Sequence, residues 1–435
     1  MRLDTDPYLQ RYATRVRGMA ASEIRALFSV VSRPEVVSFA GGMPYTAALD
    51  FQAVEDVVVE VIRDHGPTAL QYGGGQGLEG LREQLVDVMA YENIAAHTDD
   101  LIITVGGQQA LELIAKVFIN PGDVIVAEGP TYVGALGAFS SHQAEVVHVR
   151  MDADGMIPES LAETLERLAA DARRAKFVYT VPNHQNPGGV SLSVERRERI
   201  AELIEAHDLV VLEDNPYGLL DFEGITWPSF RELIPDRTIY VGTVSKTFAP
   251  GARIGWVAAP GPVRNKLTLL REAADLCPSN LTQMIVETWL RRQPWQEQVK
   301  RFREVYRERA ETMLRSLADE FPEGCTWTDP RGGFYVWVTL PRGIDTSDLL
   351  AKAVNKRVAY VPGRGFYADG QGGDQLRLCY SYPTPERIRE GVTRLGELLH
   401  DELELVRAVY GGDAPDTHGP TRRHDHDSGV AGRGG

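Results

Sequence analysis

The sequence predicts an α/β protein in which a large domain with a mostly parallel, seven-stranded sheet is followed by a smaller α+β C-terminal domain. Between about residues 50 and 260, short runs rich in branched aliphatic residues alternate with helix-period stretches, which is typical of parallel strands joined by crossover helices. Several of these runs are apolar at every position, as strands covered on both faces require. After residue 260 the chain becomes mainly helical, and two further strand-like runs follow.

The candidate strands of the large domain share a core of branched aliphatic or aromatic residues. They are Leu101–Val105, Asp123–Ala127, Val146–Val149, Lys176–Val181, Leu209–Leu212, Thr238–Val244 and Gly255–Ala258. Between two of them lies a typical crossover helix, Ser193–Ala206. Ser193 can serve as its N-cap, and Ile200, Leu203 and Ile204 fall on one face.

The second half of the chain predicts a separate and smaller body. A helical stretch runs from Lys266 to Val299 with a break around Cys277, and a strongly charged helix continues to Glu320. Two later runs have the aromatic and β-branched content of strands, Gly332–Leu340 and Gln375–Tyr380.

The two ends of the chain differ from the middle. Residues 1–48, with a helical Ala21–Val31 and an extended Val36–Phe39, are too short to fold alone, so we expect them to pack on the small domain beside the active site. The last 25 residues carry seven glycines and one branched aliphatic residue, a composition that predicts a disordered tail. The expected division is an N-terminal segment, a large domain, a small domain and a tail, over residues 1–48, 49–295, 296–410 and 411–435.

Charge and cysteine content argue against several classes of protein. The 46 Lys and Arg residues against 61 Asp and Glu residues give a net charge of −15, whereas a nucleic-acid or membrane partner needs clustered positive charge. The three cysteines lie far apart in no C-x-x-C pair, so neither a disulfide framework nor a metal site is predicted. The N-terminus lacks an apolar signal core and no 18-residue run is apolar enough to span a bilayer. We therefore expect a soluble, cytoplasmic protein.

Ligands of open α/β sheets bind beyond the carboxyl ends of the strands, and polar residues gather at those positions here. Gly106-Gly107-Gln108-Gln109 follows the first strand and opens a helix, where free backbone N–H groups favour a phosphate, although an ordinary βα turn fits equally well. Tyr132 follows the second strand, as a stacking face for a planar ligand or as a core residue. The turn Asn183–Gly189 follows the fourth strand and is rich in amides.

Two further strand ends carry charged residues. Asp214 and Tyr217 follow Leu209–Leu212, and a buried carboxylate at this position requires a cationic partner. Lys246 follows Thr238–Val244 and precedes Arg253, which combines an amine nucleophile with a phosphate clamp. Together the strand ends suit a ligand with an aldehyde, a phosphate, a flat ring and a ring nitrogen.

At these residues the chain resembles the fold-type I, class I/II aminotransferases, over about Ser22 to His400. Three stretches resemble the lysine, aspartate and asparagine motifs of that family, namely Ser245–Gly255, Glu213–Gly218 and Asn186-Pro187-x-Gly189. Gln71-Tyr72-Gly73 resembles its early Tyr-Gly segment. Within the family, Ser22-x-Ile24-Arg25 and Ser38–Pro44 resemble the branch of 2-aminoadipate and kynurenine aminotransferases.

This resemblance implies the fold of the pyridoxal 5′-phosphate-dependent transferases, that cofactor, and a homodimer with shared active sites. Lys246 is similar to the lysine that forms a Schiff base and moves the proton, and Asp214 to the partner of the pyridinium nitrogen. Asn186 and Tyr217 are similar to the donors to the ring O3′, and Tyr132 to the stacking residue. The residues that match the phosphate cup are Gly107, Gln108, Thr243, Ser245 and Arg253, joined by Tyr72 of the partner subunit.

The resemblance also implies how the substrate is held. Arg377 is similar to the arginine that binds the α-carboxylate, assisted by Asn186, and Gly41 and Arg25 fall where the branch contacts its substrate. Arg25 is either a contact for an acidic or polar side chain or a solvent-exposed helix residue. One departure is that Gly188 replaces the usual threonine, which predicts extra room beside it. Another is that Thr243 stands where serine is commoner.

The implied reaction exchanges an amino group between an L-amino acid and a 2-oxo acid by a ping-pong mechanism. Its donors are either a broad set of 2-aminoadipate, glutamate and aromatic type or an unusual amino acid of secondary metabolism. The alternatives are a β-lyase or decarboxylase with the same cofactor and, more remotely, an aminotransferase-like regulator, for which the expected DNA-binding module of ~60 residues has no room. Gly75-x-Gly77-x-x-Gly80 fits the dinucleotide fingerprint but follows a helical stretch rather than a strand.

Overall fold

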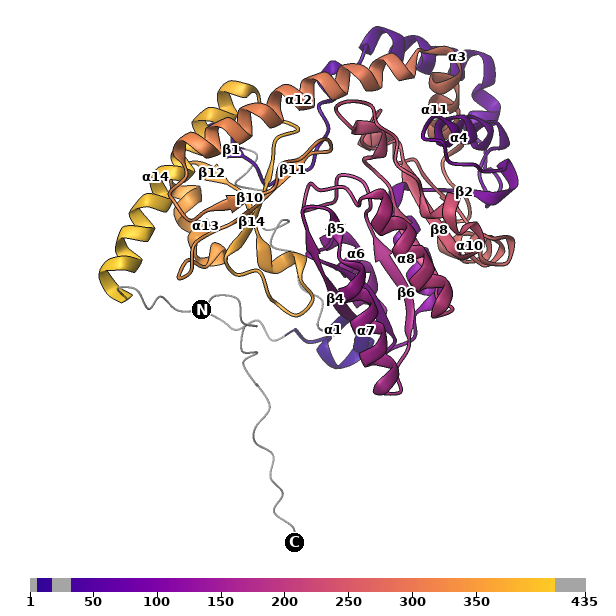
Figure 1. The fold of residues 1–435 in the computed structure, drawn as a ribbon. Coiled ribbons are helices and arrows are strands. Elements are labelled where there is room, and N and C mark those ends of the chain that lie inside the picture. Colours follow the sequence, from indigo (N-terminus) through magenta and orange to yellow (C-terminus); the bar gives the residue numbers. More distant parts are fainter. Residues whose placement is uncertain (1–5, 18–32, 411–435) are drawn as a thin grey trace.

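The computed structural model describes residues 6–17 and 33–410, and this part of the chain forms two bodies, each built around its own sheet (Figure 1). The sheet of the larger body contains β2 (Leu101–Thr104), β3 (Val124–Gly129), β4 (Glu145–Asp152), β5 (Gly155–Met156), β6 (Ala175–Thr180), β7 (Val211–Asp214), β8 (Thr238–Thr243) and β9 (Gly255–Ala258). The strand order is β2-β9-β8-β7-β6-β3-β4-β5. Strands β4, β3, β6, β7 and β8 pair in parallel, whereas β9 is antiparallel to both of its neighbours and β5 to β4.

All seven predicted strands are present in this sheet. The predicted strand number is nevertheless too small by one, because β5 adds an eighth strand at the edge. With two residues, β5 is too short to show a period in the sequence. The carboxyl ends of β3, β6, β7 and β8 lie along one edge of the sheet, which is where the polar turns were expected to meet.

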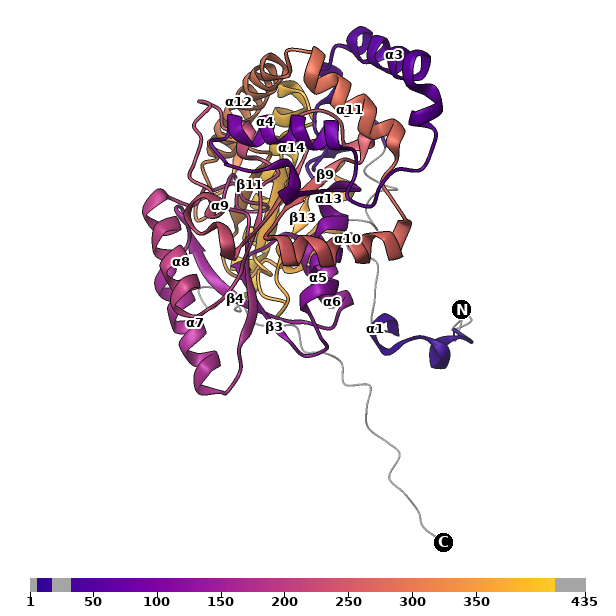
Figure 2. The same cartoon turned by 90° about the vertical axis from the view of Figure 1, so that its right-hand side faces the viewer.

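Helices cover both faces of the large sheet (Figure 2). On one face, α7 (Pro158–Ala170) and α8 (Val194–Ala206) pack in an apolar cluster that includes Val126 and Val178. On the other face, α5 (Gly106–Phe118) and α6 (Val133–Ser141) pack in the main core. This core includes Ala127 and Phe177, which are adjacent in sequence to Val126 and Val178. Successive strand residues point to opposite faces, so covering both faces explains the runs that are apolar at every position.

The crossover helix α8 agrees with its prediction. Ile200, Leu203 and Ile204 are buried on one face. Ser193 occupies the N-cap position with extended backbone dihedrals, but its side chain accepts no hydrogen bond from the first turn. The predicted N-cap position of Ser193 is therefore confirmed, whereas its side chain makes no capping hydrogen bond.

The helical stretch after residue 260 breaks twice rather than once. Its parts are α10 (Gly261–Asp275), α11 (Asn280–Arg292) and α12 (Trp295–Glu320). The first break lies around Cys277, as predicted, whereas the second lies at Pro294, the N-cap of α12. Because proline has no N–H and clashes with the preceding turn, it ends α11 and permits a new helix to start after it. The remaining helices of the larger body are α3 (Phe51–Ala69), α4 (Glu79–Tyr91) and the short α9 (Phe230–Leu233).

The smaller body combines a four-stranded antiparallel sheet with helices. Its strands are β10 (Thr326–Trp327), β11 (Tyr335–Thr339), β13 (Val361–Pro362) and β14 (Gln375–Cys379), in the order β10-β11-β14-β13. The helices α13 (Thr346–Asn355) and α14 (Pro385–Tyr410) belong to it, and α12 reaches along the molecule to pack on α14 (Figure 1).

The N-terminal segment enters the small body before it reaches the large one. After the short helix α1 (Thr14–Arg17), strand β1 (Val37–Ser38) pairs in parallel with β12 (Val358–Ala359). The predicted helix Ala21–Val31, Arg25 and the tail 411–435 lie outside the described residues. Beyond β1, the chain carries Ala40, Gly41 and Gly42 to the boundary between the two bodies.

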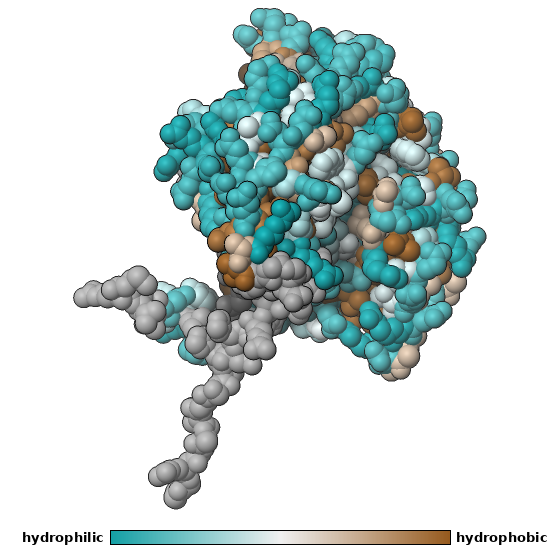
Figure 3. Space-filling view, turned by 60° about the vertical axis from the view of Figure 1, so that its left-hand side comes forward, coloured by the Kyte–Doolittle hydropathy of each residue, from teal (hydrophilic) through white to brown (hydrophobic). Residues whose placement is uncertain are grey.

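The surface shown in Figure 3 is mostly hydrophilic, with small apolar areas scattered over it. None of the helices in the described ranges 6–17 and 33–410 is both long and apolar enough to cross a bilayer.

Candidate active site

A cavity of about 420 Å³ lies at the carboxyl edge of the large sheet, where the N-terminal segment and the small body close it. It brings together residues that are far apart in the sequence, such as Gly41 and Arg377. The predicted site residues that line it are Gly41, Gly107, Gln108, Tyr132, Asn186, Asp214, Tyr217, Thr243, Ser245, Lys246, Arg253 and Arg377.

Lys246 lies just beyond the end of β8, and its half-buried side chain lines the cavity. Its Nζ donates a hydrogen bond of 2.9 Å to the carbonyl oxygen of Gly42. Burial is the main cause that lowers the pKa of Lys246 to about 8, and the nearby cations Arg377 and Arg253 contribute to this shift. A large fraction of this amine is therefore neutral near pH 8, as a nucleophile or a general base requires.

Asp214 is the last residue of β7, and its carboxylate faces the same cavity. The hydroxyl of Tyr179 donates to its Oδ2 at 2.9 Å. Burial raises the pKa of Asp214 to about 6, although the hydrogen bond from Tyr179 opposes this. Among the residues that the structure describes, no lysine, arginine or histidine forms an ion pair with Asp214. A buried carboxylate in this state fits the protonated nitrogen of a heteroaromatic ring.

One end of the cavity contains the residues predicted to bind a phosphate, and we call it the phosphate end. It is built from the N-terminus of α5 and the turn after β8. Gly107 and Gln108 lie in the first turn of α5, where backbone N–H groups have no partner within the helix. Gly255 on β9 crosses this turn so closely that a Cβ there would lie 2.7 Å from the carbonyl carbon of Gly106. The hydroxyl of Thr243 lies 2.9 Å from that of Ser245, so threonine supplies the group expected from serine.

Arg253 completes the phosphate end from the turn before β9. Its backbone is left-handed, with φ of 51°, and this conformation turns the side chain back toward α5. Its Nη2 donates to the carbonyl oxygen of Val105 at 3.0 Å. Two hydroxyls, a helix N-terminus and a guanidinium therefore surround one end of the cavity, a donor set that suits a phosphate.

Tyr132 and Asn186 lie on two neighbouring turns, and hydrogen bonds from Gln185 connect these turns. The amide of Gln185 donates to Glu128 at 3.1 Å and to the carbonyl oxygen of Pro130 at 2.8 Å. Burial raises the pKa of Glu128 to about 7. The same Gln185 accepts a hydrogen bond from the backbone N–H of Gly188 at 2.6 Å. A Cβ at Gly188 would lie 2.9 Å from the Gln185 oxygen, so the space predicted beside this glycine is occupied.

Arg377 on β14 lines the same cavity from the small body. Its guanidinium donates to Asn186 Oδ1 at 2.9 Å and to the carbonyl oxygens of Ala40 and Gly41 at 3.0 and 2.9 Å. Its buried Nε has no hydrogen-bond partner. The ring of Tyr335 lies under the guanidinium, at 4.3 Å from the ring centre. A fixed guanidinium with an unused N–H is a suitable anchor for a carboxylate.

Two predicted site residues are not brought into the cavity. Tyr72 lies between α3 and α4 and is 77% exposed, so in a single chain it reaches no ligand in the cavity. Arg25 lies outside the described residues, and its role stays a prediction. The Gly75–Gly80 run begins between the helices α3 and α4 and ends in the first turn of α4. It does not follow a strand, which disagrees with a dinucleotide site.

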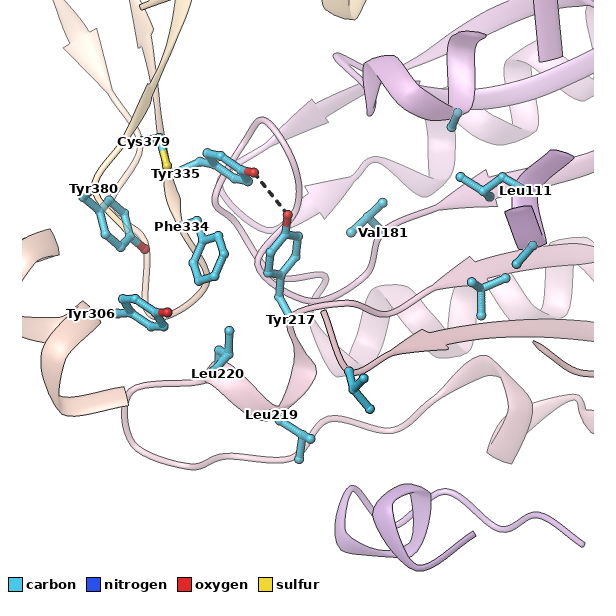
Figure 4. Close-up of a cluster of buried hydrophobic side chains, with 14 of the residues drawn as sticks. Leu111, Val181, Tyr217, Leu219, Leu220, Tyr306, Phe334, Tyr335, Cys379 and Tyr380 are labelled. Atoms are coloured by element: carbon cyan, nitrogen blue, oxygen red, sulfur yellow. Dashed lines mark hydrogen bonds between the residues drawn. The ribbon is translucent and has the colours of Figure 1, made fainter. Parts of the chain in front are cut away.

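Sequence reasoning missed several residues of the cavity wall. They are Ala40, Gly42, Met43, Pro44, Leu111, Val133, Val181, Pro216, Pro250 and Tyr335. Tyr335 is the notable omission, because its hydroxyl lies 3.3 Å from that of Tyr217 (Figure 4). The sequence places Tyr335 in a strand, but which face of that strand meets the cavity depends on a pairing register that sequence patterns do not give.

Comparison with known proteins identifies what this arrangement is similar to. The family model described as aminotransferase class I and II matches residues 34–395. The aromatic-amino-acid aminotransferase 1 of Thermococcus litoralis is 40% identical over 399 residues, which cover 91% of this chain and 96% of that protein.

Solved structures agree with the family match. The kynurenine aminotransferase of Pyrococcus horikoshii, in complex with PMP, superposes with a TM-score of 0.87 at 38% identity and covers 92% of this chain and 99% of its own. The α-aminoadipate aminotransferase of Thermus thermophilus, complexed with N-(5′-phosphopyridoxyl)-L-leucine, superposes with a TM-score of 0.85 at 33% identity. The match covers 92% of this chain and 100% of that chain.

Proposed function

Since the chain belongs to the class I and II aminotransferases, we propose that it transfers the amino group of aromatic and other large L-amino acids to a 2-oxo acid, with the site residues described above. It is an aminotransferase of broad-specificity type, and its cofactor is pyridoxal 5′-phosphate. The single observation that carries the assignment of residues is that one cavity collects Lys246, Asp214, Asn186 and Arg377.

The donor set of the cavity fits this cofactor. The hydroxyls of Thr243 and Ser245, the N-terminus of α5 and Arg253 suit its phosphate, and the ring of Tyr132 offers a stacking face. The carboxylate of Asp214, which forms no ion pair among the described residues, suits its ring nitrogen. Bound pyridoxal 5′-phosphate supplies an electron-withdrawing ring that acidifies the Cα–H of an attached amino acid.

The chain's own residues then handle the proton and the substrate. Lys246 Nζ takes the proton from the substrate Cα when neutral and returns it when protonated, and a pKa of about 8 allows both states. Asp214 is ionised above about pH 6 and keeps the ring nitrogen protonated. Arg377 holds the α-carboxylate with Asn186, which orients the Cα–H bond toward Lys246.

The preference for large apolar donors follows from the rest of the wall. Lys246, Arg253 and Arg377 already have roles, and the other described wall residues include no further lysine or arginine. Several of them are apolar, such as Met43, Leu111 and Val133. A second carboxylate on the substrate would therefore lose its hydration at this wall without a cationic partner. The predicted Arg25, outside the described residues, is a candidate for such a partner.

We also propose a homodimer in which Tyr72 completes the phosphate site of the partner subunit. The exposure of Tyr72 supports this, since a tyrosine that is 77% exposed has its hydroxyl free for another chain. Its loop is anchored, because Asn280 donates to the carbonyl oxygens of Thr68 and Gln71 at 3.3 and 3.1 Å. We retain the proposed domain boundary near residue 295, which the start of α12 at Trp295 supports.

A donor panel tests the proposed substrate class. Purified holoenzyme is assayed with phenylalanine, kynurenine, 2-aminoadipate and glutamate against a common 2-oxo acid, and the same panel is run on Arg25→Ala. We expect the highest kcat/KM for the aromatic donors in both proteins. A preference for the acidic donors that Arg25→Ala abolishes would replace this proposal with Arg25 as a side-chain contact. Release of ammonia or carbon dioxide without a 2-oxo acid acceptor would favour a lyase or decarboxylase instead.

A further inference from the structure

Tyr335 reaches into the cavity from the small body and has no role in the assignments above. It begins β11 and is 2% exposed. Two groups of the site touch it. The guanidinium of Arg377 lies 4.3 Å above its ring centre. The hydroxyl of Tyr217 lies 3.3 Å from that of Tyr335 (Figure 4).

The pairing of β11 with β14 places Tyr335 under Arg377. Tyr335 is opposite Cys379, and Trp337 is opposite Arg377. Residues opposite each other in an antiparallel pair share a face, and residues two apart on one strand share it too. Tyr335 and Arg377 are therefore diagonal neighbours on the face that looks into the cavity. A guanidinium over an aromatic face is attracted to it, and a buried pair of this kind is held in orientation.

The hydroxyl of Tyr335 is confined to one position. The rings of Tyr335 and Tyr217 meet edge to face, at 5.9 Å and 88°, and Phe334 packs on Tyr217 in the same manner at 5.3 Å. On its other side the Tyr335 hydroxyl touches the backbone of Gly42, where a Cβ would lie only 2.5 Å away. The glycine thus leaves room for this hydroxyl, and the carbonyl of the same glycine accepts from Lys246.

The two hydroxyls are neutral and can exchange donor and acceptor roles. Burial raises the pKa of Tyr217 and of Tyr335. A phenol has one proton and also accepts. When Tyr217 donates to a ligand oxygen in the cavity, Tyr335 can donate to the oxygen of Tyr217, and hydrogen bonds in such a chain strengthen one another.

We propose that Tyr335 is a positioning residue with two separable parts: its hydroxyl orients Tyr217 toward the cofactor, and its ring supports Arg377 at the substrate carboxylate. The proposal rests on the proposed function, because it uses the roles given there to Tyr217 and Arg377. It predicts that removing the hydroxyl affects cofactor binding, whereas removing the ring also affects substrate binding.

Three variants separate these effects. Tyr335→Phe removes the hydroxyl alone, and Tyr335→Leu removes hydroxyl and ring. Tyr380→Phe is the matched control, because Tyr380 is also fully buried, lies just after β14, and donates its hydroxyl to the carbonyl oxygen of Gly332 at 2.7 Å outside the cavity. Each protein is stripped of cofactor and titrated with pyridoxal 5′-phosphate by fluorescence. The reconstituted enzymes then give KM and kcat for an amino acid donor.

We expect Tyr335→Phe to raise the cofactor dissociation constant about three- to tenfold, the effect of one lost hydrogen bond, with KM for the donor within about twofold of wild type. Tyr335→Leu should in addition raise KM about tenfold. Tyr380→Phe should change neither constant. If wild-type enzyme binds the cofactor and transaminates but Tyr335→Phe matches Tyr380→Phe, this proposal is overturned. A wild-type protein that neither binds the cofactor nor transaminates would contradict the function itself.

Discussion

The side-chain nitrogen of Lys246 donates a 2.9 Å hydrogen bond to the carbonyl oxygen of Gly42, which lies 204 positions earlier in the chain. The two preceding carbonyl groups, of Ala40 and Gly41, accept from Arg377. One tripeptide of the N-terminal segment thus holds both the amine and the guanidinium at the centre of the site. This segment is anchored by β1 in the small body, so its position depends on how the small body packs on the large one.

Gly42→Ala should damage the site without unfolding the chain. The added Cβ would lie 2.5 Å from the hydroxyl oxygen of Tyr335, so either the segment or the tyrosine must shift. Since both Lys246 and Tyr335 contact Gly42, we expect kcat/KM to fall at least about tenfold, the effect of a small misplacement of catalytic groups.

The control for this variant is Gly137→Ala in α6, where a Cβ would have no atom within 4 Å. We expect it to leave the kinetic constants unchanged, because replacing a helical glycine by alanine is neutral or stabilising. Circular dichroism checks that both variants fold. Equal kcat/KM for Gly42→Ala and Gly137→Ala would show that the tripeptide does not need its observed position.

The capture of the cofactor by the stripped enzyme should depend on pH through Lys246. Only the neutral amine is a nucleophile, and the pKa of Lys246 is lowered to about 8. The second-order rate constant for binding pyridoxal 5′-phosphate should therefore rise about tenfold per pH unit below pH 8 and level off above it. Stopped-flow absorbance at several pH values measures this profile.

Replacing Arg377 tests the cause of that low pKa. The guanidinium of Arg377 lowers the pKa of Lys246, so Arg377→Gln should move the midpoint of the profile to higher pH. The same variant should raise KM for amino acids much more than it weakens cofactor binding. An unchanged midpoint in Arg377→Gln would mean that Arg377 does not contribute to the low pKa of Lys246.

The parts of the site that could be predicted from the sequence are those that follow buried strands directly. Asp214 and Lys246 come within three residues of apolar runs at the ends of β7 and β8, and parallel strands bring such ends to one edge whatever the exact register. The position of Asp214 and Lys246 at one edge of the sheet could therefore be predicted from the sequence. The identity of the ligand came from the family resemblance.

The residues that were missed depend on long-range geometry. Tyr335 reaches the cavity only because β11 pairs with β14 in one register, and Gly42 only because β1 pairs with β12, near the other end of the chain. Neither pairing leaves a local pattern in the sequence. The eighth strand β5 was missed for a different reason, since two residues give too weak a signal. Ser193 occupies the N-cap as predicted, but the sequence does not show whether its side chain makes the capping hydrogen bond.

Mixing an inactive variant with one of reduced activity should raise the activity if Tyr72 serves the partner subunit. In a dimer of one Tyr72→Phe chain and one Lys246→Ala chain, one site would have both an intact lysine and an intact tyrosine. Random exchange of subunits should then give about a quarter of the wild-type activity. Refolding or co-expression of the two chains, followed by the standard assay, measures it. Activity no higher than that of the separate variants would contradict a shared site.

Glu92 should make the stability of the enzyme depend on pH although it lies outside the cavity. It follows α4, and its Oε2 accepts a hydrogen bond of 3.0 Å from Asn215, the residue after Asp214. Burial raises the pKa of Glu92 from 4.5 to about 7. Between these values the folded chain keeps a proton that the unfolded chain releases, so this contribution to the free energy of unfolding is full below pH 4.5 and is lost as the pH rises to 7.

Glu92→Gln removes this titration while keeping an oxygen acceptor for Asn215. At about 1.4 kcal/mol per pKa unit, the variant should be more stable than wild type at pH 8 by up to about 3 kcal/mol and similar to it at pH 4.5. Thermal unfolding of the holoenzymes at both pH values measures the difference. Glu83→Gln, an exposed position on the same helix, is the control and should change neither value. A Glu92→Gln enzyme that follows the wild-type pH dependence would show that the buried carboxyl group stays ionised, which would require a cationic partner beyond the contacts found around it.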